Sequence, residues 1–228
     1  MERLIDRRDA GRRLAGRLEK YAGRDDTIVL GMPRGGVVVA FEVARALGVP
    51  LDVFIVRKLG VPWQKELAMG AISSGGVRVL NDEVVGSLGL TEDQIEAIAA
   101  REQAVLEERE REYRGHSTPL ELSGKTVILV DDGLATGASM RAAIQSLKNH
   151  RPARIVVAVP TGESGTCAEL GREVDEIICL MTPRPFVAVG LAYEDFSQTS
   201  DEEVIDLLER ARSLTSAGSP TAGKGGPH

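Results

Sequence analysis

The sequence predicts an α/β fold in which an open, mainly parallel sheet is flanked by helices on both faces. Two observations lead to this prediction. Short apolar segments alternate with segments of helical spacing along most of the chain, as expected of repeated strand–helix–strand units. The segments at 127–130 and 155–159 contain no polar residue, and this composition is typical of strands that are buried on both faces.

The chain opens with Ala10, Leu14 and Leu18 at helical spacing, which predicts an amphipathic helix. The segment KLGVPWQKE at 58–66 combines glycine, proline and charged residues, and it therefore favours a loop. The elements expected in this half after the first helix are a strand at 27–31, a helix ending at Gly48, a strand at 51–57, the loop at 58–66, and a hairpin that turns at Gly75 and Gly76.

A long charged helix is expected from Thr91 to about Tyr113. Thr91 is its predicted N-cap, and Gln94 completes a capping box. The many glutamate and arginine residues of this helix are typical of a solvated face. The elements expected after it are strands at 125–130, 154–160 and 176–180, and helices at 140–150, 166–172 and 200–211, the last with a second capping box at Ser200 and Glu203.

Composition narrows the class of protein. The length of 228 residues allows one α/β domain, expected at 1–212, and the segment 213–228 has the composition of a disordered tail. The net charge of −6 argues against a protein that coats nucleic acid. We expect no membrane span and no signal peptide, because the apolar segments are short. Cys167 and Cys179 form no CxxC motif, so we expect neither a disulfide framework nor a zinc site, and a reducing cytoplasm fits best.

The most informative segment is VILVDDGLATGAS at 127–139. A buried strand ends in Asp131 and Asp132, and a loop of small residues then opens into a helix. Ligands of open parallel sheets bind beyond the carboxyl ends of the strands. Amides at a helix N-terminus bind phosphate, and an ionised carboxylate accepts hydrogen bonds from the hydroxyls of a vicinal diol. Both features together describe a site for a ribose 5-phosphate.

Other interpretations of this segment are weaker. An incidental strand–turn–helix is the plain alternative. Receiver domains also contain a strand that ends in two aspartates, but they lack a TGAS loop directly after it. The nucleotide-binding patterns GxxxxGK[ST] and GxGxxG are both absent from the sequence.

The segment resembles the signature of type I phosphoribosyltransferases, in which four hydrophobic residues and two acids precede Thr-Gly-x-Ser/Thr. The resemblance implies that Asp131 and Asp132 act in catalysis by holding the ribose hydroxyls of phosphoribosyl pyrophosphate (PRPP). It also implies a loop for the donor's 5-phosphate that consists of Ala135, Thr136, Gly137, Ala138 and Ser139.

The family has a pyrophosphate-binding loop after the first core strand, and GMPRGG stands at the matching place. The resemblance therefore implies that Arg34, Gly35 and Gly36 bind the donor, although a plain strand-to-helix turn is the alternative.

Arg57 and Lys58 close the next expected strand, where the family has a flexible catalytic loop. Two adjacent cations suit a pyrophosphate, so both are predicted to be catalytic. The segment from Lys58 to Gly70 is predicted to be a mobile lid that carries an exposed Trp63. A static surface loop, pinned in a homodimer contact by Trp63, is the alternative.

The segment PRPFVAVGLAYEDF at 183–196 loosely resembles the part of purine phosphoribosyltransferases that stacks on the base. By this resemblance Phe186 and Val187 face the base, and Asp195 lies near the metal ion. Packing of Phe186, Tyr193 and Phe196 against the core is the alternative.

The resemblance also implies a fold with a small hood, built here by N-terminal and C-terminal additions, and a homodimer. The implied reaction transfers the phosphoribosyl group from PRPP to a nitrogenous, purine-like base, and Mg²⁺ neutralises the leaving pyrophosphate. An oxocarbenium-like transition state needs positioning and charge stabilisation. The alternative is a regulatory protein that binds PRPP or a nucleotide without turnover.

Overall fold

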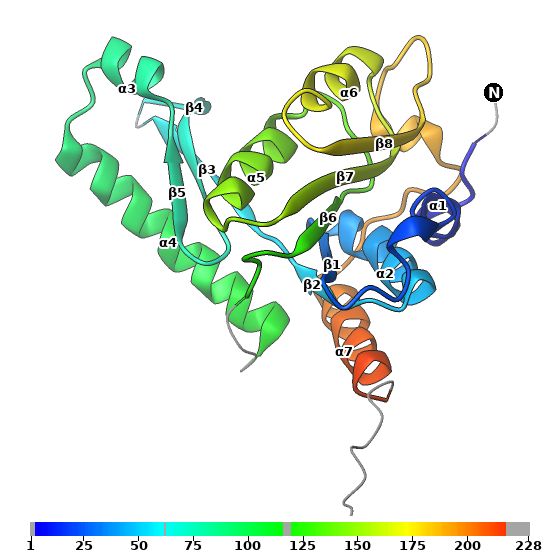
Figure 1. Cartoon of the computed structure of the whole chain (residues 1–228). Helices are drawn as coiled ribbons and strands as arrows, with labels where there is room; N and C mark the ends of the chain where they lie inside the picture. Colours follow the sequence, from blue (N-terminus) through cyan, green and yellow to red (C-terminus); the bar gives the residue numbers. More distant parts are fainter. Residues whose placement is uncertain (1–2, 62, 116–119, 218–228) are drawn as a thin grey trace, which may run out of the picture.

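Figure 1 shows a computed structural model of the chain, which describes residues 3–61, 63–115 and 120–217. The strands are β1 Thr27–Gly31, β2 Leu51–Val53, β3 Val56–Val61, β4 Gln64–Ser73, β5 Val77–Leu80, β6 Thr126–Val130, β7 Arg154–Thr161 and β8 Glu176–Met181. The α-helices are α1 Arg7–Ala15, α2 Gly35–Leu47, α3 Asp82–Leu88, α4 Glu92–Arg114, α5 Ala138–Asn149, α6 Ser164–Leu170 and α7 Asp201–Ala217, and the 3₁₀ turns are η1 Glu19–Tyr21 and η2 Val189–Ala192.

The predicted α/β fold is confirmed. Five strands form a parallel sheet in the order β2-β1-β6-β7-β8. Helix α2 connects β1 to β2, α5 connects β6 to β7, and α6 connects β7 to β8. Each core strand alternates between two hydrophobic layers. Ile128 and Val130 face the layer of α1, α2 and α7, whereas Val127 and Leu129 face the layer of α5 and α6. Burial on both faces explains why these strands read as uninterrupted apolar runs.

A second, antiparallel sheet lies beside the first, with strand order β3-β4-β5. The strand expected at 51–57 is divided between the two sheets: it leaves the parallel sheet after Val53 and enters the antiparallel one at Val56. The loop expected at 58–66 is wrong, because β3 and β4 pair along most of it. Leu59, Val61 and Met69 are buried in this hairpin, and their burial stabilises its strands. The glycine and the charged residues of the segment hide the strand pattern in the sequence.

The hood comes from the middle of the chain, whereas the family resemblance led us to expect it from the two ends. It consists of β3, β4, β5, α3 and α4, all inserted between β2 and β6. The terminal helices α1 and α7 instead pack on α2, beside the parallel sheet. No prediction was made for α3, whose N-cap is Asn81.

Helix α4 begins as predicted, with a reciprocal capping box between Thr91 and Gln94. It is solvated along much of its length, but one stripe is buried against the hood sheet. Ile95, Ile98 and Leu106 lie on this stripe. The helix is therefore amphipathic, although its charged residues obscure the pattern.

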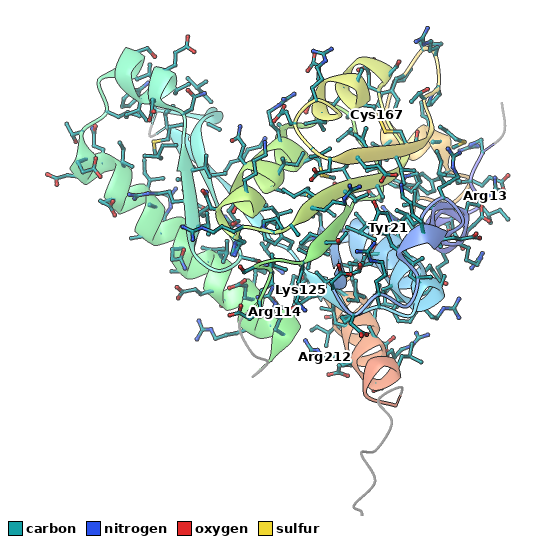
Figure 2. The ribbon with its side chains drawn as sticks, in the orientation of Figure 1. Arg13, Tyr21, Arg114, Lys125, Cys167 and Arg212 are labelled. Carbon is teal, nitrogen blue, oxygen red and sulfur yellow. A yellow bond between two sulfur atoms is a disulfide. The ribbon has the colours of Figure 1, made fainter. Side chains whose placement is uncertain are left out.

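Both ends of the hood are anchored close to β2. At its start, the Phe54 amide donates a hydrogen bond of 3.0 Å to the Gly31 carbonyl. At its end, Arg114 (Figure 2) donates from Nε to Asp52 at 2.9 Å and from Nη2 to the Val53 carbonyl at 2.7 Å. Both ends of the hood are therefore held beside the carboxyl end of β2, and the hood also packs against α5 and α7.

Two further expectations need correction. Cys167 and Cys179 are joined in a disulfide, which links α6 to β8. The cysteines come together because the crossover between β7 and β8 is short, and no local motif marks this pairing. Helix α7 continues to Ala217, past the helix end expected at Ala211, and the residues after it lie outside the described residues. Within the described ranges, no helix is both long and apolar enough to cross a membrane.

Candidate functional site

The carboxyl ends of the parallel strands open onto a cleft of about 390 Å³, bounded on its far side by α4 and α7. Four predicted site residues line it: Arg34, Arg57, Asp131 and Ser139. Among the lining residues that were not predicted, three have polar or charged side chains: Arg109, Tyr113 and Asp201. The cleft therefore joins segments from the core, the hood and the last helix.

Asp131 occupies the floor of the cleft, directly after β6. The first turn of α2 comes so close that a Cβ on Gly36 would lie 2.9 Å from both the Cα and Oδ1 of Asp131. Glycine is thus required here to bring the pyrophosphate-loop candidate against the acid. Burial, together with the neighbouring charge of Asp132, raises the pKa of Asp131 well above its ordinary value.

Asp132 has a different environment from Asp131, because α1 reaches over it. Arg7 donates from Nε to Asp132 Oδ2 at 2.8 Å, and both side chains are largely buried. Tyr193 donates its hydroxyl to the Asp132 carbonyl at 2.5 Å. A Cβ on Gly35 would lie 2.0 Å from Asp132 Oδ2, so this glycine leaves room for the ion pair. Arg7 was not predicted, since 125 residues separate it from Asp132.

The phosphate-loop candidate, residues 135–139, runs into the N-terminus of α5. Thr136, Ala138 and Ser139 are exposed, and Gly137 adopts the left-handed conformation with φ of 73°. The amides in the first turn of a helix have no partner inside that helix, so α5 presents donors to this loop. Such a nest, followed by a helix N-terminus, can bind an anion.

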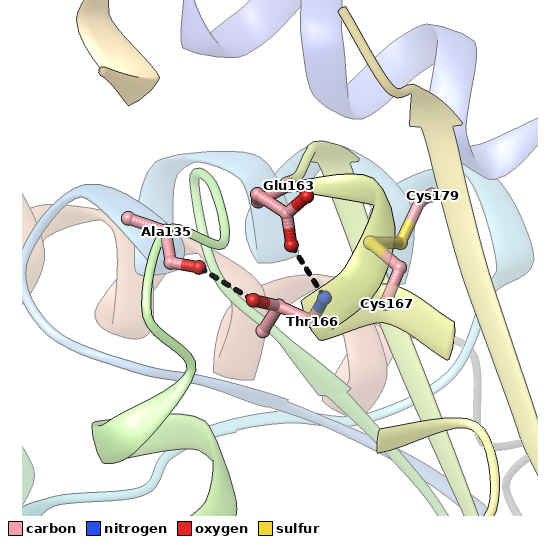
Figure 3. The surroundings of a disulfide bond; sticks show 5 residues. All are labelled: Ala135, Glu163, Thr166, Cys167 and Cys179. Carbon is pink, nitrogen blue, oxygen red and sulfur yellow. Dashed lines mark hydrogen bonds between the residues drawn. A yellow bond between two sulfur atoms is a disulfide. The ribbon is translucent and has the colours of Figure 1, made fainter. Parts of the chain in front are cut away.

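Helix α6 supports this loop from the side, as Figure 3 shows. Thr166 donates its hydroxyl to the Ala135 carbonyl at 2.9 Å, and its amide donates to the Glu163 carboxylate at 2.6 Å. The disulfide begins at the next residue, Cys167, and ties α6 to β8. A short chain of contacts thus connects the phosphate-loop candidate to the edge of the sheet.

The two cations predicted at β3 are placed differently. Arg57 lines the cleft, but its guanidinium donates to Glu102 Oε2 from Nε at 2.8 Å and from Nη2 at 2.6 Å. Burial opposes the charge of Glu102, yet hydrogen bonds from Arg57 and Arg101 lower its pKa overall. Lys58 is exposed and lines a neighbouring hollow of about 330 Å³ between β3 and α4.

Asp201, on the far wall of the cleft, contacts three side chains: two from α4 and one from the turn before α2. Arg109 Nη1 lies 3.0 Å from its Oδ2, and Arg34 Nη1 lies 3.8 Å from the same oxygen. Tyr113 donates its hydroxyl to the other carboxylate oxygen. The hydrogen bond from Tyr113 lowers the pKa of Asp201, and Arg109 acts in the same direction. Arg109 and Tyr113 are four residues apart on α4, a helical spacing that could have marked them as neighbours.

The remaining predicted residues lie away from this cleft. Val187 is 73% exposed, and Phe186 is partly buried in the segment that follows β8. Tyr193 is fully buried, which agrees with the packing alternative for this residue. Phe196 is exposed, and its ring centroid lies 5.0 Å from that of Tyr193. Asp195 accepts a hydrogen bond of 2.9 Å from the Ser197 amide and lines a separate small pocket that also includes Arg7.

Comparison with known proteins places this arrangement in context. The model of the phosphoribosyl transferase domain family matches residues 4–179. A protein of Mycobacterium tuberculosis that is provisionally named a phosphoribosyl transferase is 47% identical over 219 residues, which cover 96% of this chain. Those residues are 49% of the relative, so the chain spans about half the length of that protein.

Two further similarities concern part of the chain and its structure. The bifunctional protein PyrR of Chloroflexus aurantiacus is 34% identical over 129 residues, which are 55% of this chain and 65% of that protein. The crystal structure of TT1426 from Thermus thermophilus is 43% identical, with a TM-score of 0.81, and covers 91% of this chain and 98% of its own.

Proposed function

Because the chain belongs to the phosphoribosyltransferase family, we propose that it transfers the 5-phosphoribosyl group of PRPP to a nitrogenous base and releases pyrophosphate. One observation carries the proposal: Arg34, Arg57, Asp131 and Ser139 line a single cleft. These residues come from three segments, and they were predicted to touch three parts of the same donor: the pyrophosphate, the ribose hydroxyls and the 5-phosphate. Their convergence is what a PRPP site requires.

In the proposed complex, the 5-phosphate binds the amides and hydroxyls of residues 135–139. The ribose hydroxyls donate to Asp131, and to the carboxylate oxygen of Asp132 that does not face Arg7. The pyrophosphate lies against the turn at Arg34–Gly36 and toward Arg57. The two glycines of that turn keep Cβ atoms out of the space beside the acids, which favours close approach of the donor to the backbone.

Magnesium fits this site through the donor's own oxygens. Mg²⁺ in phosphate-transfer sites is usually held by one or two carboxylates and by substrate phosphates. Asp131 lines the cleft, and so does Asp201, but both oxygens of Asp201 are already engaged by Arg109, Arg34 and Tyr113. The bound ion would neutralise charge on the leaving pyrophosphate. Asp195 supports this role less well, since it lies in a separate pocket.

The chain's own residues supply positioning and electrostatics. The bond between C1 and the pyrophosphate oxygen breaks, and its electron pair leaves with the pyrophosphate. A ring nitrogen of the acceptor then bonds to C1 through its lone pair, and the proton of that nitrogen is released to water. Positive charge develops on the ribose while negative charge grows on the leaving group. Fixed cations near the pyrophosphate and fixed amides near the 5-phosphate stabilise this separation of charge.

Donor binding is tested by calorimetry with PRPP and MgCl₂. The wild type is expected to bind, and Thr136→Pro is expected to bind at least about tenfold more weakly, because proline removes an amide donor from the loop. Equal affinity in the two folded proteins would refute the donor assignment. Turnover is then tested by pyrophosphate release over a panel of purine and pyrimidine bases.

A second candidate is a regulatory protein that binds PRPP without turnover. It is favoured by the engagement of Arg57 with Glu102 and of Asp132 with Arg7, which occupies two groups predicted to touch the donor. Tight PRPP binding without pyrophosphate release on any base would support this candidate over the enzyme.

A further inference from the structure

The far wall of the cleft contains a compact charged cluster in which only Arg34 belongs to a segment that was predicted to bind the donor. It consists of Arg34 before α2, Arg109 and Tyr113 on α4, and Asp201 at the start of α7. Three different segments thus meet at a single carboxylate. All four residues line the same cleft as Asp131 and Ser139.

The cluster has a net positive charge. Arg34 and Arg109 face the single negative charge of Asp201 at 3.8 and 3.0 Å. Tyr113 adds no charge, because burial and its hydrogen bond to Asp201 raise its pKa. Glu112 contacts Arg109 more distantly, at 3.4 Å, and from the adjacent turn of the same helix. A guanidinium has five N–H donors in a planar fork, so Arg109 can bind Asp201 and a second anion together.

The orientation of Arg109 is fixed from two sides. Its helix is held to the core through Arg114, and its guanidinium is held through Asp201. Tyr113 is buried one turn away and donates to the same carboxylate, so Asp201 cannot turn away without breaking that bond. A guanidinium held in this manner is preorganised for an anion and loses little freedom when the anion binds.

Resting on the proposed function, we infer that Arg109 of the hood helix binds the pyrophosphate of the donor together with Arg34, and that Asp201 is the positioning residue for Arg109. The pyrophosphate is the most highly charged part of PRPP, and it would lie beside the turn that contains Arg34. The hood would thereby contribute directly to donor binding. Arg109 remains protonated throughout and stabilises the electron pair that the leaving group takes from C1.

The experiment compares Arg109→Gln with Arg111→Gln in calorimetric titrations. Arg111 lies on the same helix, is exposed, and contacts the carbonyl of Glu107 in its own helix. Three probes are used with MgCl₂: PRPP, inorganic pyrophosphate and ribose 5-phosphate. Arg109→Gln is expected to weaken PRPP and pyrophosphate by about ten- to a hundredfold, the range for a hydrogen bond to a charged group. Its affinity for ribose 5-phosphate, and all three affinities of Arg111→Gln, should equal those of the wild type.

The outcomes separate this inference from the proposed function. If the wild type binds neither PRPP nor pyrophosphate, the proposed function fails. If the wild type binds PRPP and Arg109→Gln binds it equally well, only the inference fails. Equal weakening of all three probes would indicate a structural defect and would also overturn the role of Arg109. Should Arg109→Gln not fold, Arg109→Lys serves instead, and it should lose affinity for pyrophosphate because a point charge replaces the planar fork.

The role of Asp201 is tested by a double-mutant cycle on pyrophosphate binding. If Asp201 positions Arg109, then Arg109→Gln should cost less affinity in an Asp201→Asn background than in the wild type. Additive effects of the two substitutions would overturn the positioning role. A purely structural effect of Asp201→Asn would not produce this coupling, since it would affect both backgrounds alike.

Discussion

Arg7 forms an ion pair with Asp132 across 2.8 Å, and this contact joins the first helix to the end of the central strand β6. Arg7 also donates to the Ser197 carbonyl at 2.7 Å, and its guanidinium lies 3.9 Å from the centre of the Phe196 ring. The two adjacent acids of the signature are therefore not equivalent. Asp132 is neutralised by the protein itself, while Asp131 faces the cleft.

Substitution of the acids one at a time should reveal this difference as opposite effects on stability. Asp132→Asn removes the charge that Arg7 contacts, and we expect it to lower the free energy of unfolding by about 1–3 kcal/mol. Asp131→Asn removes a carboxylate whose charge is disfavoured by burial, and we expect equal or higher stability at neutral pH. Urea denaturation of both variants measures the difference. Similar losses of stability in the two variants would contradict the expected difference. Both variants should bind the donor more weakly than the wild type does.

The raised pKa of Asp131 gives the stability difference a pH dependence. The folded state binds this proton more tightly than the unfolded chain, whose ordinary Asp value is about 3.9. Protonated Asp131 therefore stabilises the folded state fully below about pH 4, and this stabilisation is lost as the pH rises through the pKa of Asp131 in the folded state. Asp131→Asn does not titrate, so its advantage over the wild type should be largest at about pH 7.5 and should shrink toward about pH 4. An advantage that grows on acidification would show that the pKa is lowered instead.

Gly35→Ala should damage the site, because its Cβ would lie 2.0 Å from Asp132 Oδ2 and 2.5 Å from Arg7 Nε. We expect a loss of about 1–3 kcal/mol in stability, and weaker PRPP binding. Gly86→Ala is the matched control, since Gly86 lies inside helix α3 and a Cβ there meets no atom within 4 Å. It should stabilise the protein by about 0.4–1 kcal/mol. Thermal unfolding of the two variants in parallel decides the matter.

Trp63 offers a test of whether the β3–β4 hairpin closes on the donor. Its side chain is 60% exposed at the end of this hairpin, and it is the only tryptophan of the chain. Closure over PRPP and Mg²⁺ should move the indole to a drier environment and shift its emission to shorter wavelength. Trypsin cleavage after Lys58 should slow at the same time. If neither signal changes at saturating ligand, the hairpin does not close on the donor.

Sequence patterns predicted the parallel sheet well because its strands are buried on both faces. In segments such as 127–130 every side chain is apolar, so both faces of the strand must be buried, and composition alone identifies the strand. The hairpin at 56–73 was missed for the opposite reason. Most side chains of β3 are only partly buried or exposed, and Gly60 and the charged residues interrupt the alternation that would have marked the hairpin.

The candidate site divides in the same way. Asp131 and Ser139 belong to one short segment in which a strand ends and a helix begins. This local structure is recognisable from the sequence, so both residues could be predicted. Arg7 and Asp201 belong to no such segment. Their contacts with Asp132 and Arg109 join residues far apart in the chain, and they arise only when the terminal helices pack beside the sheet. No local pattern of charges specifies such a contact.

The insertion of the hood between β2 and β6 has a consequence for how this architecture can diversify. The chain leaves the parallel sheet beside Phe54 and re-enters it beside Leu122, and both side chains are buried in the same layer of the core. The hood side of the cleft therefore comes from one contiguous stretch of the sequence. Exchange of that stretch alone would replace Arg57, Arg109 and Tyr113 together, while the strand order and the acids of the core stayed as they are. Relatives built on one scaffold could in this manner differ in the groups that the hood presents to the cleft, while the core keeps its fold.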